Sequence, residues 1–131
     1  MTPNAVRLAI VAAISSSWAT ATPICYPNQQ FIAPQTCWIS FTIKMSETIL
    51  GELGNDGISM RVGILMVSIY DLVGNGVKNA LDYADRVEAI FRRKELSGVI
   101  FNEPSTDTVG VDESGYFHVM VSIDFRAWVG E

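Results

Sequence analysis

Residues 116–125 read YFHVMVSIDF and have the clearest alternating pattern in the chain. The odd positions are all apolar, and the even positions are mostly polar. A period of two residues is typical of a β-strand with one face in a core and the other in water. Residues 37–45, CWISFTIKM, repeat the pattern, with polar or amphipathic side chains at Trp38, Ser40, Thr42 and Lys44. We therefore expect two strands whose odd positions, including Cys37 and Phe117, face the core.

The segment 58–72 predicts a third long strand, but both of its faces are apolar. We assign its core face to the even positions Ile58, Met60, Val62, Ile64, Met66 and Tyr70. The odd positions begin polar and then become apolar at Leu65, Val67 and Ile69. A second apolar face needs a cover, and in a chain this short another subunit can supply it. Leu65, Val67 and Ile69 are therefore the candidate subunit interface.

Two helices are expected around these strands. The first covers the N-terminus, with Thr2 as its cap and Pro3 in its first turn. The second begins after Gly74-Asn75-Gly76, ends near Lys94 and carries the i,i+4 pairs Asp82–Arg86 and Glu88–Arg92. Its expected buried stripe is Val77, Ala80, Leu81, Ala84, Val87 and Phe91.

Shorter segments complete the outline. Ile24-Cys25-Tyr26 suits a short edge strand, and Val99-Ile100-Phe101 suits another strand. Residues 51–57, GELGNDG, are rich in turn formers and predict the tip of a long hairpin. Residues 105–114 are interpreted as a polar loop. The prediction is an α+β fold: a mostly antiparallel sheet with two helices packed on one face, in the order α-β-β-α-β-β.

The N-terminal segment also permits a second interpretation. Arg7, the apolar run from Leu8 to Ile14 and the small residues Ala19-Thr20-Ala21 resemble a secretory signal peptide. A mature amphipathic helix is favoured, because Val6, Ala9, Ile10 and Ala13 recur at helical spacing. Cleavage after Ala21 would remove most of that helix, so the intact mass distinguishes the two interpretations.

Length and charge restrict the possible functions. The chain has 131 residues, 49% of them hydrophobic, and a net charge of −5, which suits one domain over residues 1–131 with its own core. The one basic run, Arg92-Arg93-Lys94, suits a helix C-terminus, and direct nucleic-acid binding is not expected. No apolar stretch reaches membrane-spanning length, so no membrane partner is expected.

The sequence offers no convergent set of catalytic groups. His118 is the one histidine and lies on the polar face of its strand, so we interpret it as a surface residue. Gly74-Asn75-Gly76-Val77-Lys78 lacks the spacing of a phosphate-binding loop, and one histidine with two separated cysteines does not make a tetrahedral metal site. We expect no enzyme activity, no catalytic residues, no cofactor and no metal.

The order and spacing of these segments resemble those of the tail terminator, or tail completion, proteins of long-tailed bacteriophages. The resemblance covers nearly the whole chain but includes no invariant signature. Its parts follow the N-terminal helix in order: the segment from Thr22 to Asn28, "FIAPQTCWISFTI", a Gly-containing hairpin tip, "MRVGILMVSIYDLVGNG", "ALDYADRVEAIF" and "GYFHVMVSIDFRAW". The loop from Ser105 to Ser114 departs from the family pattern.

The resemblance implies a structural role in the virion tail, with assembly in the host cytoplasm. Proteins of this kind form a six-subunit ring on the last ring of the tail tube, stop its polymerisation and provide the surface that joins the head. The implied partners are further copies of the chain in a hexamer, the tail tube protein and a head–tail connector protein. DNA would pass through the lumen without specific binding, which the Ser/Thr-rich face of residues 38–44 and the net acidity would suit.

The hairpin tip from Glu47 to Asp56 is the candidate contact with the tail tube, because a long hairpin reaches beyond its domain. The candidate contact residues are Glu47, Glu52, Asn55 and Asp56. Three alternatives stay open: another head–tail connector or neck protein, a small α+β enzyme, and a secreted binding domain with a cleaved signal. The secreted domain would be supported by one Cys25–Cys37 disulfide.

Overall fold

A computed structural model describes residues 2–18, 22–27, 32, 36–50, 59–74, 77–111 and 115–128. These residues form two helices and a seven-stranded sheet. In chain order the elements are α1 (Pro3–Trp18), β1 (Ile24–Cys25), β2 (Trp38–Leu50), β3 (Ser59–Leu72), α2 (Lys78–Phe91), β4 (Glu95–Leu96), β5 (Val99–Phe101), β6 (Ser105–Val111) and β7 (Tyr116–Trp128).

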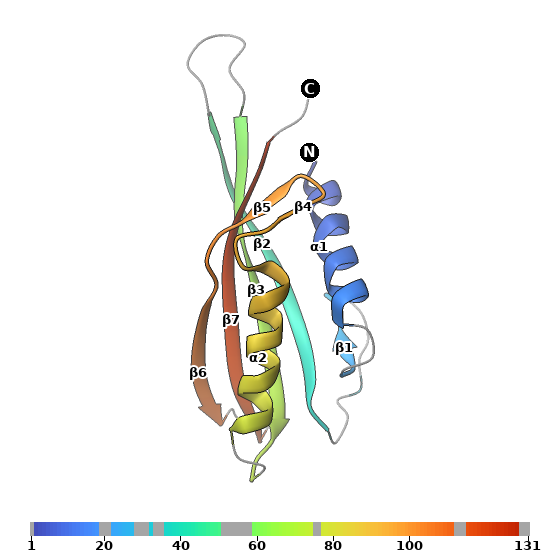
Figure 1. Cartoon of the computed structure of the whole chain (residues 1–131), viewed down its shortest axis with the longest axis vertical. Coiled ribbons are helices and arrows are strands. Elements are labelled where there is room, and N and C mark those ends of the chain that lie inside the picture. The colour runs from blue at the N-terminus through green and yellow to red at the C-terminus, as the bar shows by residue number, and fades with distance from the viewer. Residues whose placement is uncertain are drawn as a thin grey trace.

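The sheet is built on the three long strands β2, β3 and β7. Its strand order is β1-β2-β3-β7-β5-β4, and β6 pairs with a separate part of β7. All pairings are antiparallel except that of β1 with β2. Both helices pack on the same face of the curled sheet (Figure 1). The predicted α+β class with two helices on one face is confirmed, and so is the short edge strand β1. The strands β4 and β6 are added to the predicted order.

The odd-numbered residues of β2, β3 and β7 form the core beneath the helices. Leu65 pairs with Ile43 on β2 and with Ile123 on β7, so the odd faces of all three strands coincide. The placement of odd positions in the core is confirmed for β2 and β7. For β3 the prediction was the even positions, and it is wrong: the odd residues Leu65, Val67 and Ile69 face the core and are 0%, 1% and 0% exposed. These three residues lie inside the protomer and are not available as a subunit interface.

The helices supply the other half of the core. Thr2 caps α1, because its Oγ1 accepts a hydrogen bond from the backbone N–H of Ala5 at 3.1 Å. The buried face of α1 consists of Val6, Ala9, Ile10, Ile14 and Trp18. The buried face of α2 consists of Ala80, Ala84, Val87 and Phe91. Two residues expected in that stripe, Val77 and Leu81, are exposed because they lie on the outer side of the first turn.

One predicted loop is a strand. Residues 105–111 form β6, which pairs with β7 from Ser105 opposite Ser122 to Val111 opposite Phe117. The pattern concealed the strand because β6 lies at a sheet edge, where most of its side chains are exposed. A register shift between Thr108 and Gly110 interrupts its alternation further.

Candidate functional site

The helix-free face of the sheet carries the even-numbered side chains of β2, β3 and β7. At one end, Trp38, Tyr70 and His118 are neighbours across the three strands. The Trp38 and Tyr70 rings stack with centroids 4.3 Å apart, and the Tyr70 and His118 rings stack at 4.5 Å. Tyr116 meets Tyr70 edge-on at 6.2 Å. His118 thus lies on the helix-free face of the sheet, as expected, and its ring is half-buried in an aromatic stack.

The chemistry of this open face changes along the strands. Beyond the aromatic stack, the next two rows across the three strands are uncharged and consist of Ser40, Ser68 and Met120, then Thr42, Met66 and Ser122. Charged residues follow in the row of Lys44, Ile64 and Asp124, and Arg126 lies in the row after it. The middle of the open face is therefore an uncharged surface rich in hydroxyl groups.

The residues expected at the hairpin tip are only partly described. Glu47 belongs to β2, whereas Glu52, Asn55 and Asp56 lie outside the described residues. The arms of β2 and β3 that lead to the tip extend beyond the end of α2 (Figure 1).

The two lateral edges of the sheet differ from each other. At one edge, β6 is exposed along its length, and Val109 and Val111 are 55% and 62% exposed. At the opposite edge, two adjoining cavities of about 260 and 400 Å³ share Arg7 and Pro27. We call them the α1–β2 groove, which is lined chiefly by Arg7, Val11, Tyr26, Pro27, Phe41 and Ile43. The sequence pattern gave no sign of this groove, because its walls come from α1, the segment after β1, and β2.

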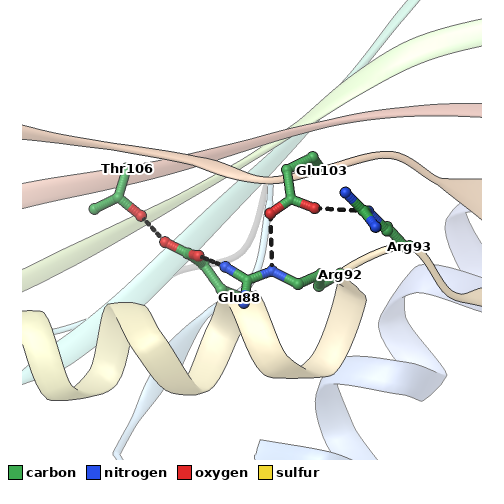
Figure 2. A network of polar contacts seen from close by, with 5 residues as sticks. All are labelled: Glu88, Arg92, Arg93, Glu103 and Thr106. Carbon is green, nitrogen blue, oxygen red and sulfur yellow. Dashed lines mark hydrogen bonds and ion pairs between the residues drawn. The ribbon is translucent and has the colours of Figure 1, made fainter.

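A polar network fastens the β6 edge to α2 (Figure 2). Glu88 accepts hydrogen bonds from the side chains of Arg92 and Thr106, so one carboxylate joins α2 to β6. Glu103 continues the network with contacts of 3.1 Å to Arg92 and 3.0 Å to Arg93. The predicted Glu88–Arg92 pair is confirmed.

The other predicted helix pair differs from the structure. Asp82 is 2.7 Å from Lys78, and this contact raises the pKa of the Lys78 ammonium group. The Arg86 guanidinium instead lies over the Trp18 ring, 5.4 Å from its centroid. This contact ties the outer part of α2 to the end of α1.

We expect Glu88→Gln to lower the free energy of unfolding by about 1–2 kcal/mol, because two hydrogen bonds lose their ionised acceptor. The Glu88 side chain is only 17% exposed, so water replaces these bonds poorly. Asp85, an exposed acid on the same helix, supplies the control: Asp85→Asn is expected to change stability by less than about 0.5 kcal/mol. Urea unfolding followed by circular dichroism measures both variants, and equal stabilities would contradict a bridging role for Glu88.

The two cysteines do not form a disulfide. Both are free thiols, and Cys25 pairs across the strands with Ser40, three residues from Cys37. At about 3.3 Å per strand residue, this register places the two Cα atoms about 10 Å apart, which exceeds the reach of a disulfide. The secreted-domain alternative therefore lacks the bond that would support it.

Burial makes Cys37 a poor nucleophile. Desolvation and the nearby Asp71 carboxylate raise the pKa of its thiol from 9.0 to about 12. Both effects disfavour the thiolate, which is the reactive form. Cys37 is therefore a packing residue, in agreement with the buried thiol that the strand pattern predicts.

Alkylation tests this assignment. At pH 8, the shift lowers the thiolate fraction of Cys37 from about one-tenth to about one ten-thousandth. In a Cys25→Ser variant, iodoacetamide should therefore label the folded protein about a thousandfold more slowly than the urea-unfolded chain. Mass spectrometry gives both rates. Similar rates in the two states would show that Cys37 ionises normally in the fold.

Among the described residues, no group of three or more His, Cys, Asp or Glu side chains could hold a metal ion. Neither described helix is both long and apolar enough to cross a membrane. The features left to explain are the open sheet face, the two unlike edges and the extended hairpin arms.

These features occur in a chain whose sequence matches the profile of the phage tail terminator proteins over residues 5–125. The chain belongs to the phage tail terminator family. The family is structural and non-enzymatic, and its members are components of the phage tail that associate with the tail tube. The resemblance seen in the order of the sequence segments is confirmed.

The fold of this tail terminator also occurs in a solved structure. That protein is 18% identical, and the alignment covers 100% of this chain and 99% of the other with a TM-score of 0.73. At this identity the match shows that the two chains share a fold. No curated protein matches the sequence.

Proposed function

We propose that this tail terminator forms a closed ring of six copies on the last ring of the tail tube. The ring stops tube polymerisation and presents the surface to which a head–tail connector protein binds. The observation that carries the proposal is the difference between the two edges of one sheet, an exposed strand on one side and an apolar groove on the other. Unlike, complementary surfaces on one chain suit a head-to-tail contact, and such contacts close into rings.

The contact with the tail tube is assigned to the hairpin between β2 and β3. Both strands extend beyond the end of α2 (Figure 1). The contact residues in this proposal are Glu47, Glu52, Asn55 and Asp56. Three of the four are acidic, so they suit a tube surface with exposed basic or amide groups.

The open face of the sheet is assigned to the lumen, through which DNA passes without specific binding. Its two middle rows carry hydroxyl and thioether side chains and no charge. A surface without cations gives the DNA phosphates no counterion-releasing contacts. Lys44 and Arg126 are restricted to the far part of this face, where Asp124 lies near them in the pairing register.

Purification of the full chain followed by native mass spectrometry and negative-stain imaging tests the ring. We expect a six-fold ring that blocks elongation of purified tail tube protein. A chain that stays monomeric alone and with tube protein would overturn the proposal.

The double substitution Glu52→Lys with Asp56→Lys tests the tail-tube contact and should abolish capping while leaving the ring intact. Asp85→Lys on the exposed face of α2 is the control and should cap normally.

A further inference from the structure

The two lateral edges of the sheet carry opposite charges beside apolar groups. The β6 edge presents Asp107 and Val109, which are both exposed. The α1–β2 groove at the opposite edge presents an arginine, Arg7, beside an apolar lining. An exposed valine next to an acid on one surface thus corresponds to a cavity next to a base on the other.

The groove is preformed. Asn4 Oδ1 accepts hydrogen bonds from Arg7 Nε at 3.1 Å and from Nη2 at 2.9 Å, which orients the guanidinium at the groove. An arginine side chain has five N–H donors, so others stay available to a partner carboxylate. Tyr26 packs edge-on against Phe41, with ring centroids 5.6 Å apart, and this contact holds the apolar wall in place.

The position of β6 is also fixed by contacts within the protomer. The Glu88–Thr106 bond and the pairing with β7 fix the start of β6 next to Asp107. Within the described part of the chain, no ion pair uses Arg7 or Asp107, so both charges are available to another molecule. β6 contains no lysine or proline, the residues that commonly protect exposed edges from pairing.

We propose that the α1–β2 groove binds the β6 edge of a second copy of this chain, with Val109 seated in the groove and Asp107 paired with Arg7. This inference rests on the proposed ring and specifies its subunit junction. Because the two surfaces lie at opposite edges of one sheet, the contact is head-to-tail, and each copy uses both surfaces. The occupant is a second copy because one chain carries both members of the complementary pair.

Charge reversal gives the sharpest test, with assembly measured by analytical ultracentrifugation at several concentrations. Arg7→Asp and Asp107→Arg each place like charges at every junction, and each should raise the concentration for half-assembly at least about tenfold. In a ring where the two variants alternate, every junction again pairs opposite charges, so an equimolar mixture restores the contact. It should therefore assemble at a concentration within about threefold of wild type.

A second test examines the apolar part of the junction with two valines of nearly equal exposure. Val109→Asp should abolish assembly, because a carboxylate would enter an apolar cavity. Val73→Asp is the matched control, since Val73 is 54% exposed in the turn after β3. Circular dichroism melts check that both variants fold, which is expected at exposed positions.

The outcomes separate this junction from the ring itself. If wild type forms a ring but the two charge variants assemble normally, or their mixture stays dissociated, the junction is wrong and the ring stands. If Val109→Asp loses binding to tail tube protein yet keeps the ring, the β6 edge contacts the tube, and the junction is again wrong. A wild-type chain that never self-associates overturns both proposals.

Discussion

We expect Leu65→Asp to leave the chain unfolded and Met66→Asp, one residue later, to leave it folded. Leu65 is fully buried between Ile43 and Ile123, beneath the helices. The substitution removes a packed side chain and buries a carboxylate without a partner, at a cost of about 5 kcal/mol or more. Because small domains are stable by only about 5–15 kcal/mol, this cost is close to the whole stability.

Met66 points to the opposite, helix-free face and is the matched control. An aspartate at position 66 would keep its carboxylate hydrated. We therefore expect Met66→Asp to lower the free energy of unfolding by about 1 kcal/mol and to keep a native circular dichroism spectrum. Urea unfolding of both variants measures the difference. A folded, monomeric Leu65→Asp variant would contradict the burial of Leu65 and restore it as a subunit contact.

Trp18→Ala is expected to cost about 3–5 kcal/mol and to lower the melting temperature by about 10–20 °C. Trp18 is 0% exposed and joins several parts of the fold. Its indole N–H donates to Thr22 Oγ1 at 3.0 Å, and its ring lies 5.5 Å from that of Tyr83 on α2. Truncation thus removes a large apolar contact and leaves Thr22, itself buried, without this partner.

The control for this prediction is Trp128→Ala at the end of β7. Trp128 is 44% exposed, so its loss should cost no more than about 1 kcal/mol. Differential scanning calorimetry compares the two tryptophan variants. Equal melting temperatures would mean that α1 is not docked as the structure shows.

The burial of α1 favours a mature helix over a signal peptide for this segment, because cleavage after Ala21 would remove five buried residues.

The sequence predicted the elements with strong local periodicity. The alternation in β2 and β7 gave both the strands and their core faces, because a polar face marks the opposite side. Thr2 and the spacing of Val6 and Ile10 gave α1 and its cap. Even the two-residue strand β1 was expected, since prolines confine such a segment to an edge.

The pattern was insufficient where both faces of a strand are apolar or where neither face is buried. β3 is apolar on both sides, so its local periodicity cannot choose between Leu65 and Met66 as the core residue. β6 is exposed on both sides and resembles a polar loop. The proposed junction was missed for the same reason, because the α1–β2 groove joins residues that are distant along the chain.

Strand periods, helix caps and turn residues are local properties, and the order of the segments was enough to suggest a tail terminator. The core face of β3 is not local: shifting a strand by one residue exchanges every side chain between the two faces. The pairing of Leu65 with Ile43 and Ile123 makes that choice, since it aligns the odd positions of three strands beneath the helices. The same register leaves the even face open and places β6 and the α1–β2 groove at opposite edges.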